Sequence, residues 1–116
     1  MYQEQQKQLT NFIEVMRQIA YKPEMYLGDR RISSIFHFVQ GYLFAVLIVH
    51  KKEGENKVVQ NFSMFHEFTA NKLNKKLNGF GWLGMMLEHC NGDEEKAFEF
   101  FYESFEEFIV EQNEKI

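Results

Sequence analysis

The sequence contains very little cysteine or proline. Of its 116 residues, only Cys90 is a cysteine and only Pro23 is a proline. A single cysteine excludes an intramolecular disulfide and is typical of a reducing compartment. A single proline favours helices over a β-sandwich rich in turns. We therefore expect a reduced, mainly helical protein of the cytoplasm.

Export and membrane signals are also missing. Residues 1–8 are polar and lack the apolar core of a signal peptide. The most apolar stretch, 35–49, would cover about 22 Å as a helix, less than the roughly 30 Å hydrocarbon core of a bilayer. His37, Gln40 and Gly41 interrupt it. We expect no membrane span here, but a central helix packed on several sides.

The patterns of catalytic and metal sites are absent as well. No two histidines have the spacing of a helical metal site, and the sequence has no CxxC, phosphate-binding glycine loop or nucleophile elbow. His89 and Cys90 are adjacent, so on a helix their side chains diverge by about 100°. The other histidines are His37, His50 and His66. We therefore expect no enzyme activity, no cofactor and no metal.

What the chain does contain is apolar and aromatic residues in helical patterns. Apolar residues make up 45% of the sequence, enough for one core, and the length suits one domain over residues 1–116. The aromatic residues are thirteen Phe, five Tyr and Trp82. Apolar residues recur at helical spacing in five segments, which predicts an all-α bundle. The segments are 3–20, 33–51, 58–73, 82–90 and a last helix that begins after Asp93.

The helix ends follow from local signals. Pro23 ends the first helix, and Gly28 permits a left-handed turn in the loop 21–31. Ser33 or Ser34 is expected to cap the second helix, and Asp93 the last. Three further expectations concern the interior of the chain: a strand starting at Val58-Val59 as the alternative to a helix there, turns at 78–81 and at Asn91-Gly92, and close approach of another element to Gly41.

The charges are unevenly distributed. Residues 1–87 carry eleven Lys or Arg and seven acids, whereas residues 88–116 carry two Lys and ten acids. The net charge of −4 argues against a general nucleic-acid partner. On a helical wheel, acids line the side of the last helix opposite a buried stripe of Ala97, Phe98, Phe101, Phe105, Phe108 and Ile109.

This acidic side is the candidate site. Acids four residues apart repel one another by a few tenths of a kcal/mol per pair, so their retention suggests a basic partner. A solvated helix face is the alternative interpretation. The candidate partner-binding residues are Glu95, Glu99, Glu103, Glu106, Glu107 and Val110.

One loop motif resembles a known ATPase family. The string 22–29, Lys-Pro-Glu-Met-Tyr-Leu-Gly-Asp, is similar to the RPGMYIG segment of the DNA gyrase B ATPases. In that family the following helix supplies a catalytic Glu and a metal-binding Asn. Here no Glu, Asp or Asn occurs between Ser33 and His50, and the chain is too short for that ATP-binding fold. The resemblance therefore does not predict an ATPase.

A second resemblance covers more of the chain. Four elements are similar to the small helical immunity proteins of contact-dependent or polymorphic toxin systems, including those paired with EndoU-type RNA nucleases: the motif 22–29, Phe38-x-x-Gly41-Tyr42, Phe80-Gly-Trp82 and Glu94-Glu-Lys-Ala-Phe98-x-x-Phe101. The resemblance implies turn or packing roles for Gly28 and Gly41, and core roles for Tyr26, Tyr42 and Trp82. Glu24 departs from the pattern, which has Gly there.

The leading hypothesis is therefore a non-enzymatic bacterial immunity protein of the cytoplasm. It would bind a cognate toxin domain, most simply a nuclease, and cover its basic substrate surface, without a nucleic-acid or membrane partner. Neither the toxin nor the number of copies in the assembly follows from the sequence. Two other hypotheses stay open: a helical adaptor with another partner, and a small enzyme or ligand-binding domain with a pocket near Tyr26, His66 and Trp82.

Overall fold

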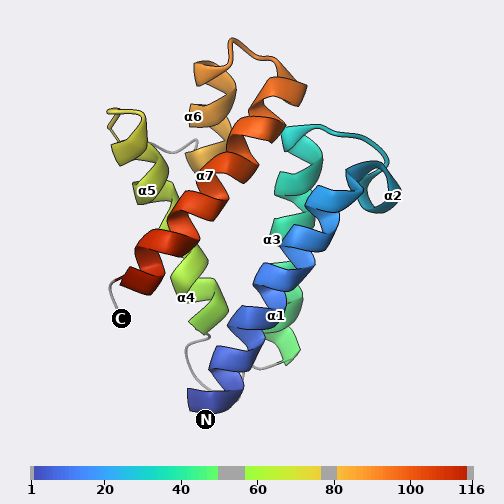
Figure 1. Ribbon diagram of the computed structural model, residues 1–116, viewed down its shortest axis with the longest axis vertical. Helices are drawn as coiled ribbons and strands as arrows, with labels where there is room; N and C mark the ends of the chain where they lie inside the picture. The colour runs from blue at the N-terminus through green and yellow to red at the C-terminus, as the bar shows by residue number, and fades with distance from the viewer. Residues whose placement is uncertain (1, 50–56, 77–80, 115–116) are drawn as a thin grey trace.

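The computed structural model describes residues 2–49, 57–76 and 81–114, and these form helices without any strand. The helices are α1 (Tyr2–Tyr21), α2 (Pro23–Leu27), α3 (Ile32–Val49), α4 (Lys57–Ser63), α5 (Phe65–Lys72), α6 (Gly81–His89) and α7 (Glu94–Glu114) (Figure 1). The all-α prediction is confirmed, and the strand considered at Val58-Val59 is wrong because both residues lie in α4. Of the turn expected at 78–81, residues 78–80 lie outside the described residues.

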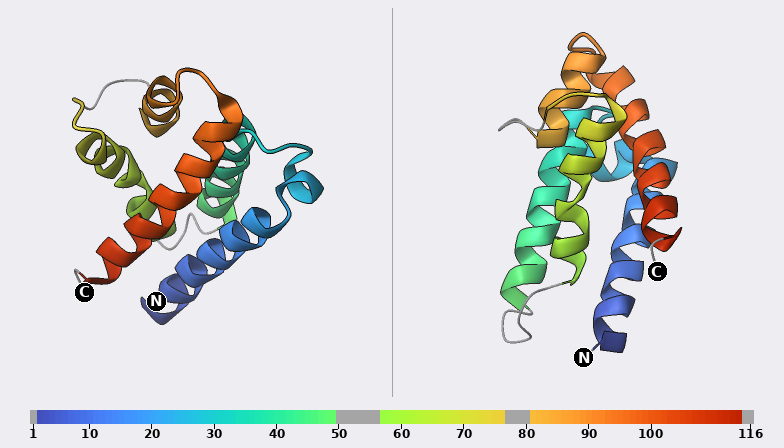
Figure 2. Two further views of the ribbon diagram at one scale, coloured as in Figure 1. Left: turned by 45° about the horizontal axis from the view of Figure 1, so that its top comes forward. Right: turned by 90° about the vertical axis from the view of Figure 1, so that its left-hand side faces the viewer.

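Two layers of helices enclose the core. α1 and α7 form one layer, and α3, α4, α5 and α6 form the other (Figure 2, right). Between them lies a cluster dominated by aromatic rings, in which Trp82 and Phe101 have centroids 4.7 Å apart. The apolar stripe predicted for α7 faces this cluster, with Ile109 at its half-buried edge. The stripe therefore fixes the opposite, acidic side of α7 toward solvent.

Two breaks raise the number of helices above the five predicted. Pro23 ends α1 as expected, but it also occupies the first turn of a short helix, α2, that ends at Gly28 with φ +86°. The segment 58–73 bends at Met64, where the amide N–H bonds back three residues to the carbonyl of Asn61 (3.2 Å). The Ser63 hydroxyl donates a hydrogen bond to the Gln60 carbonyl (2.6 Å) and so competes with backbone N–H groups for this acceptor.

The start of α7 has the cap that the sequence predicts, whereas the start of α3 does not. The Asp93 carboxylate accepts the N–H groups of Glu95 and Lys96 at 3.1 and 3.0 Å, so the cap prediction is confirmed. The turn before it has φ +55° at Asn91 and +79° at Gly92, also as predicted. α3 begins at Ile32, so neither Ser33 nor Ser34 precedes the helix as its cap.

The expectation that α3 is packed on several sides is wrong for its C-terminal half. Ile32, Ile35 and Val39 are buried, but Phe44 is 67% exposed, and Gly41 is exposed with no atom within 4 Å of the place that a Cβ would take. This half of α3 lies at an edge of the bundle (Figure 2, right). Among the described helices, α3 is the one long and apolar enough to cross a membrane, judged by length and composition alone.

Of the aromatic residues that the immunity-protein resemblance places in the core, some are buried and one is exposed. Trp82 is fully buried, as expected, and Tyr42 is half-buried with its ring 5.2 Å from that of Phe12. Tyr26 is 49% exposed on α2, so its expected place in the core is wrong.

Candidate functional site

The outward side of α7 is the most highly charged surface that the sequence predicts. The helix carries eight glutamates and one lysine. It crosses the front of the bundle diagonally, with α1 on one side and α5 on the other (Figure 1). Its candidate residues therefore fall into three groups: those beside α1 and α2, those beside α5, and those between.

Beside α1 and α2, the glutamates are paired within the chain. Arg17 of α1 donates two hydrogen bonds to the carboxylate of Glu106, at 2.7 and 2.9 Å. These bonds raise the pKa of Arg17 above its ordinary value. Arg30 donates to Glu99 at 2.9 Å. Both pairs are exposed. The Arg17–Glu106 pair contributes at most about 1 kcal/mol to stability.

Beside α5, a lysine pairs with another glutamate of α7. Lys72 donates to the carboxylate of Glu107 at 2.9 Å, and its ammonium group lies 4.8 Å from the ring centre of Phe100. The sequence-based picture of nearly unopposed acids is therefore wrong for Glu99, Glu106 and Glu107. Part of the excess negative charge of residues 88–116 is therefore paired with basic residues of the preceding part of the chain.

Between these groups runs a strip without internal counterions. Glu95 and Glu103 are exposed, and within the described part of the chain neither has an ion-pair partner. Val110 lies two turns after Glu103 on the same side of the helix and is 55% exposed. We call Glu95, Glu103 and Val110 the open strip. It combines uncompensated negative charge with one exposed apolar side chain.

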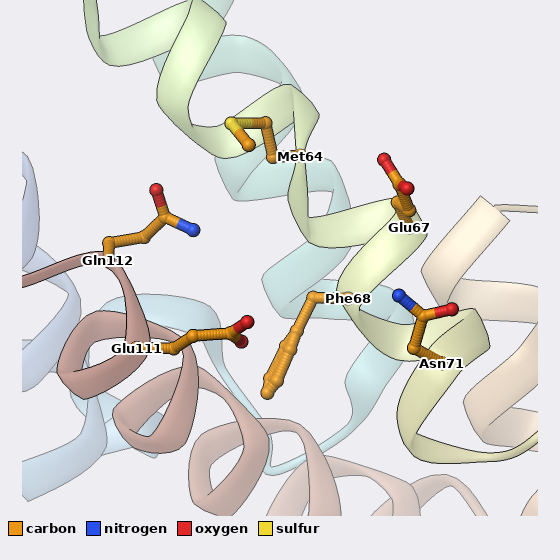
Figure 3. A pocket seen from close by; sticks show the side chains of 6 residues that line it. All are labelled: Met64, Glu67, Phe68, Asn71, Glu111 and Gln112. Atoms are coloured by element: carbon orange, nitrogen blue, oxygen red, sulfur yellow. The ribbon is translucent and has the colours of Figure 1, made fainter. Parts of the chain in front are cut away.

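A groove lies between the acidic side of α7 and α5. Its deeper part is a hollow of about 140 Å³ lined by Met64, Glu67, Phe68, Asn71, Glu111 and Gln112. Phe68 points from α5 toward α7 and forms an apolar surface in this hollow, and the carboxylate of Glu111 points toward it from α7 (Figure 3). A second, wider hollow of about 370 Å³ continues past Phe68 to Lys72 and Glu107. The α5/α7 groove thus places acids around an aromatic ring.

Sequence reasoning missed this groove. Glu67 and Phe68 lie 43 or more residues from Glu111, on a different helix, and the helical wheel of either helix alone gives no sign that they meet. The available signal was indirect, because Phe68 lies off the buried stripe of α5. The packing of α5 on α7 had to be known first.

The residues considered for a ligand pocket do not form one site. Nδ1 of His66 accepts the backbone N–H of Trp82 at 3.0 Å, and a Cβ at Gly81 would lie 2.6 Å from the same imidazole, so that space is filled. Burial lowers the pKa of His66. Tyr26 lies on α2, which packs on α1 and α3 instead.

Two other side chains of reactive types, His89 and Cys90, pack against the rest of the protein. The ring of His89 lies 4.6 Å from that of Phe100. Burial raises the pKa of the half-buried Cys90 thiol, which disfavours the reactive thiolate. Within the ranges described above, no group of three His, Cys, Asp or Glu side chains could hold a metal ion.

Comparison with protein-family models, curated proteins and solved structures finds no match for this chain. Function is therefore inferred from the surface chemistry and the sequence motifs.

Proposed function

We propose that this chain is an immunity-type inhibitor that binds a basic protein surface with the open strip of α7 and the adjoining α5/α7 groove. The observation that carries the proposal is the pairing pattern on α7. Glu99, Glu106 and Glu107 have internal partners, whereas Glu95 and Glu103 between and beside them have none among the described residues. Their charge remains available to an external cation.

The groove adds a place for individual basic side chains. A lysine or arginine of the partner can lay its aliphatic stem on Met64 and Phe68 and bring its charge near the carboxylates of Glu67 and Glu111. A guanidinium group would also stack on the Phe68 ring. The strip and the groove together therefore supply both long-range attraction and local anchoring.

A toxin nuclease is the partner class that fits the motifs. A nuclease domain needs a basic surface to hold phosphates, and an acidic protein that covers this surface excludes the nucleic acid. Electrostatic attraction also speeds association, which matters for an inhibitor that must act before the toxin cuts. The immunity-protein resemblance, carried by 22–29, Gly41 and Trp82, points to the same role in the cytoplasm of a bacterium.

The test uses the product of the gene adjacent to this one as the candidate toxin. The purified product should bind this chain and lose its nuclease activity in a stoichiometric titration. The variant Glu95→Lys/Glu103→Lys should inhibit less well. The control, Glu14→Lys/Glu88→Lys, makes the same change in net charge, from −4 to zero, on α1 and α6.

The two variants distinguish an effect of the charges on α7 from an effect of the total charge of the chain. Weaker inhibition by the α7 variant alone supports the proposed surface, whereas equal loss in both variants means that only total charge matters. An adjacent gene product that neither binds nor is inhibited contradicts the toxin assignment. Binding to a partner without toxic activity favours the adaptor hypothesis instead.

A further inference from the structure

We propose that a second copy of this chain docks on the exposed, C-terminal half of α3. The patch comprises Phe44, Leu47, Ile48 and Val49, with Gly41 and Ala45 on the same exposed side. We call it the α3 patch. It lies in the layer opposite α7 (Figure 2, right), so the proposal is independent of the proposed toxin-binding surface.

The exposed apolar side chains are concentrated here. Phe44, Leu47, Ile48 and Val49 are 67, 44, 54 and 73% exposed, and they fall within the last six residues of one helix. A shallow hollow of about 260 Å³ lined by Tyr42, Ala45, Val46 and Val49 extends the same apolar surface. Contiguous apolar patches of this kind on a folded protein mark interaction sites.

The charge pattern favours a second copy as the occupant. α3 contains no Asp, Glu, Lys or Arg from Ile32 to Val49. In a two-fold dimer each surface meets itself, so a charged surface repels its copy whereas an uncharged apolar surface does not. The acids of α7 lie in the other layer and stay apart in such a dimer. The α3 patch is therefore a surface on which two copies of this acidic chain can meet without repulsion.

The area and the local shape are also sufficient. The exposed parts of these side chains amount to roughly 500 Å² per copy, or on the order of 1,000 Å² for a pair, near the lower limit for specific interfaces. No atom lies within 4 Å of a Cβ at Gly41, and Ala45 follows one turn later. Small residues at this spacing allow two helices to approach closely. We expect a dimer with a dissociation constant in the micromolar range.

A membrane is the competing occupant. If α3 spanned a membrane as a single helix, it would face lipid on all sides, but Ile32, Ile35 and Val39 are buried in the protein core. Only attachment of the folded chain to a membrane surface remains, and the test below distinguishes it from dimerisation.

Sedimentation velocity of the full chain from about 1 to 100 µM tests the proposal. The wild type should shift from monomer to dimer over this range. Phe44→Glu should weaken the dimer by about 100-fold or more, because it buries an unpaired charge in the interface. Met25→Glu is the matched control: Met25 is 68% exposed on α2, outside the patch, and this variant should dimerise like the wild type. A wild type that stays monomeric, or equal effects of both substitutions, overturns the proposal.

Cross-linking supplies a readout that does not depend on the charged variant folding. In a Cys90→Ser background, Ile48→Cys should form a disulfide-linked dimer on oxidation, whereas Met25→Cys should not. Flotation with vesicles of phosphatidylcholine and phosphatidylglycerol covers the membrane alternative. A monomeric wild type that floats with these vesicles, with Phe44→Glu left behind, contradicts the dimer and assigns the α3 patch to lipid.

Discussion

The carboxylate of Glu94 caps another helix through Ser33. Its two oxygens accept the Ser33 amide N–H at 2.9 Å and the Ser33 hydroxyl at 2.7 Å, although the residues are 61 positions apart. Arg31 adds an ion pair to the same carboxylate at 3.3 Å. The first turn of α3 thus receives its acceptor from the first turn of α7. This relationship ties the N-terminus of α7 to the N-terminus of α3.

The cap predicts unequal roles for two neighbouring serines. Ser33→Ala removes a hydroxyl that Glu94 binds and should lower the free energy of unfolding by about 1–2 kcal/mol. Ser34→Ala is the control, because the Ser34 hydroxyl has no such partner among the described residues, and it should change stability by less than about 0.5 kcal/mol. Urea unfolding followed by circular dichroism measures both. Equal losses would mean that the hydrogen bond from the Ser33 hydroxyl to Glu94 does not stabilise the fold.

His66 makes stability depend on pH. Its Nδ1 must be unprotonated to accept the Trp82 N–H, and burial lowers its pKa below the ordinary value of 6.5. The unfolded chain therefore binds a proton more readily than the folded chain. The contribution of His66 is complete above about pH 6.5 and is lost as the pH falls through its lower folded-state pKa, by at most about 1.4 kcal/mol per pH unit.

Unfolding free energies between pH 7.5 and about 5.5 test this sign. His66→Asn should be less stable than the wild type at pH 7.5, and its stability should change less as the pH falls. His37→Asn removes an exposed histidine and should keep the wild-type slope. A His66→Asn protein with an unaltered slope would remove His66 as the cause.

Two glycines should respond in opposite directions to alanine. Gly41 is exposed inside a helix and meets no atom, so Gly41→Ala should stabilise the monomer by up to about 1 kcal/mol. Gly81 has φ +61°, and its Cβ would lie 2.6 Å from the His66 ring, so Gly81→Ala should destabilise by about 1–3 kcal/mol. Thermal unfolding at low protein concentration compares them. A destabilising Gly41→Ala would restore the packed-helix interpretation of α3.

The sequence predicts the elements of this fold better than their contacts. Helical periodicity, Pro23, Gly28 and Asp93 are local signals, and each has the structural consequence expected of it. The position of Gly41 is not local: apolar neighbours suggested a buried helix, but burial depends on which helices arrive beside it. Composition cannot distinguish a core helix from a helix with an exposed apolar side.

In the candidate site, too, the sequence predicts the features of one helix better than its contacts with other helices. The helical wheel placed the acids of α7 outside correctly, because the Phe stripe alone decides which side is buried. It could not show that Arg17, Arg30 and Lys72 would reach Glu106, Glu99 and Glu107, since these pairs span 35 to 89 residues. The open strip became visible only after these internal pairs were known.

These pairs lead to a prediction about partner binding. Arg17→Ala frees the carboxylate of Glu106 and leaves α7 more negative, at a stability cost of no more than about 1 kcal/mol. The variant should therefore associate faster with a basic partner at low salt than the wild type does. Stopped-flow mixing measures the rate. An unchanged rate would show that Glu106 lies outside the interface, and slower association would show that Arg17 itself contacts the partner.

The association rate of the wild type and of Glu95→Lys/Glu103→Lys with the adjacent gene product, at low and at high salt, tests the central claim most directly. The wild type should associate quickly at low salt and slow markedly at high salt. The variant should associate slowly at both, with circular dichroism showing an intact fold. Glu14→Lys/Glu88→Lys should keep most of the wild-type rate and salt dependence. A folded Glu95→Lys/Glu103→Lys protein with the wild-type rate and salt dependence would contradict the assignment of the open strip as the binding surface.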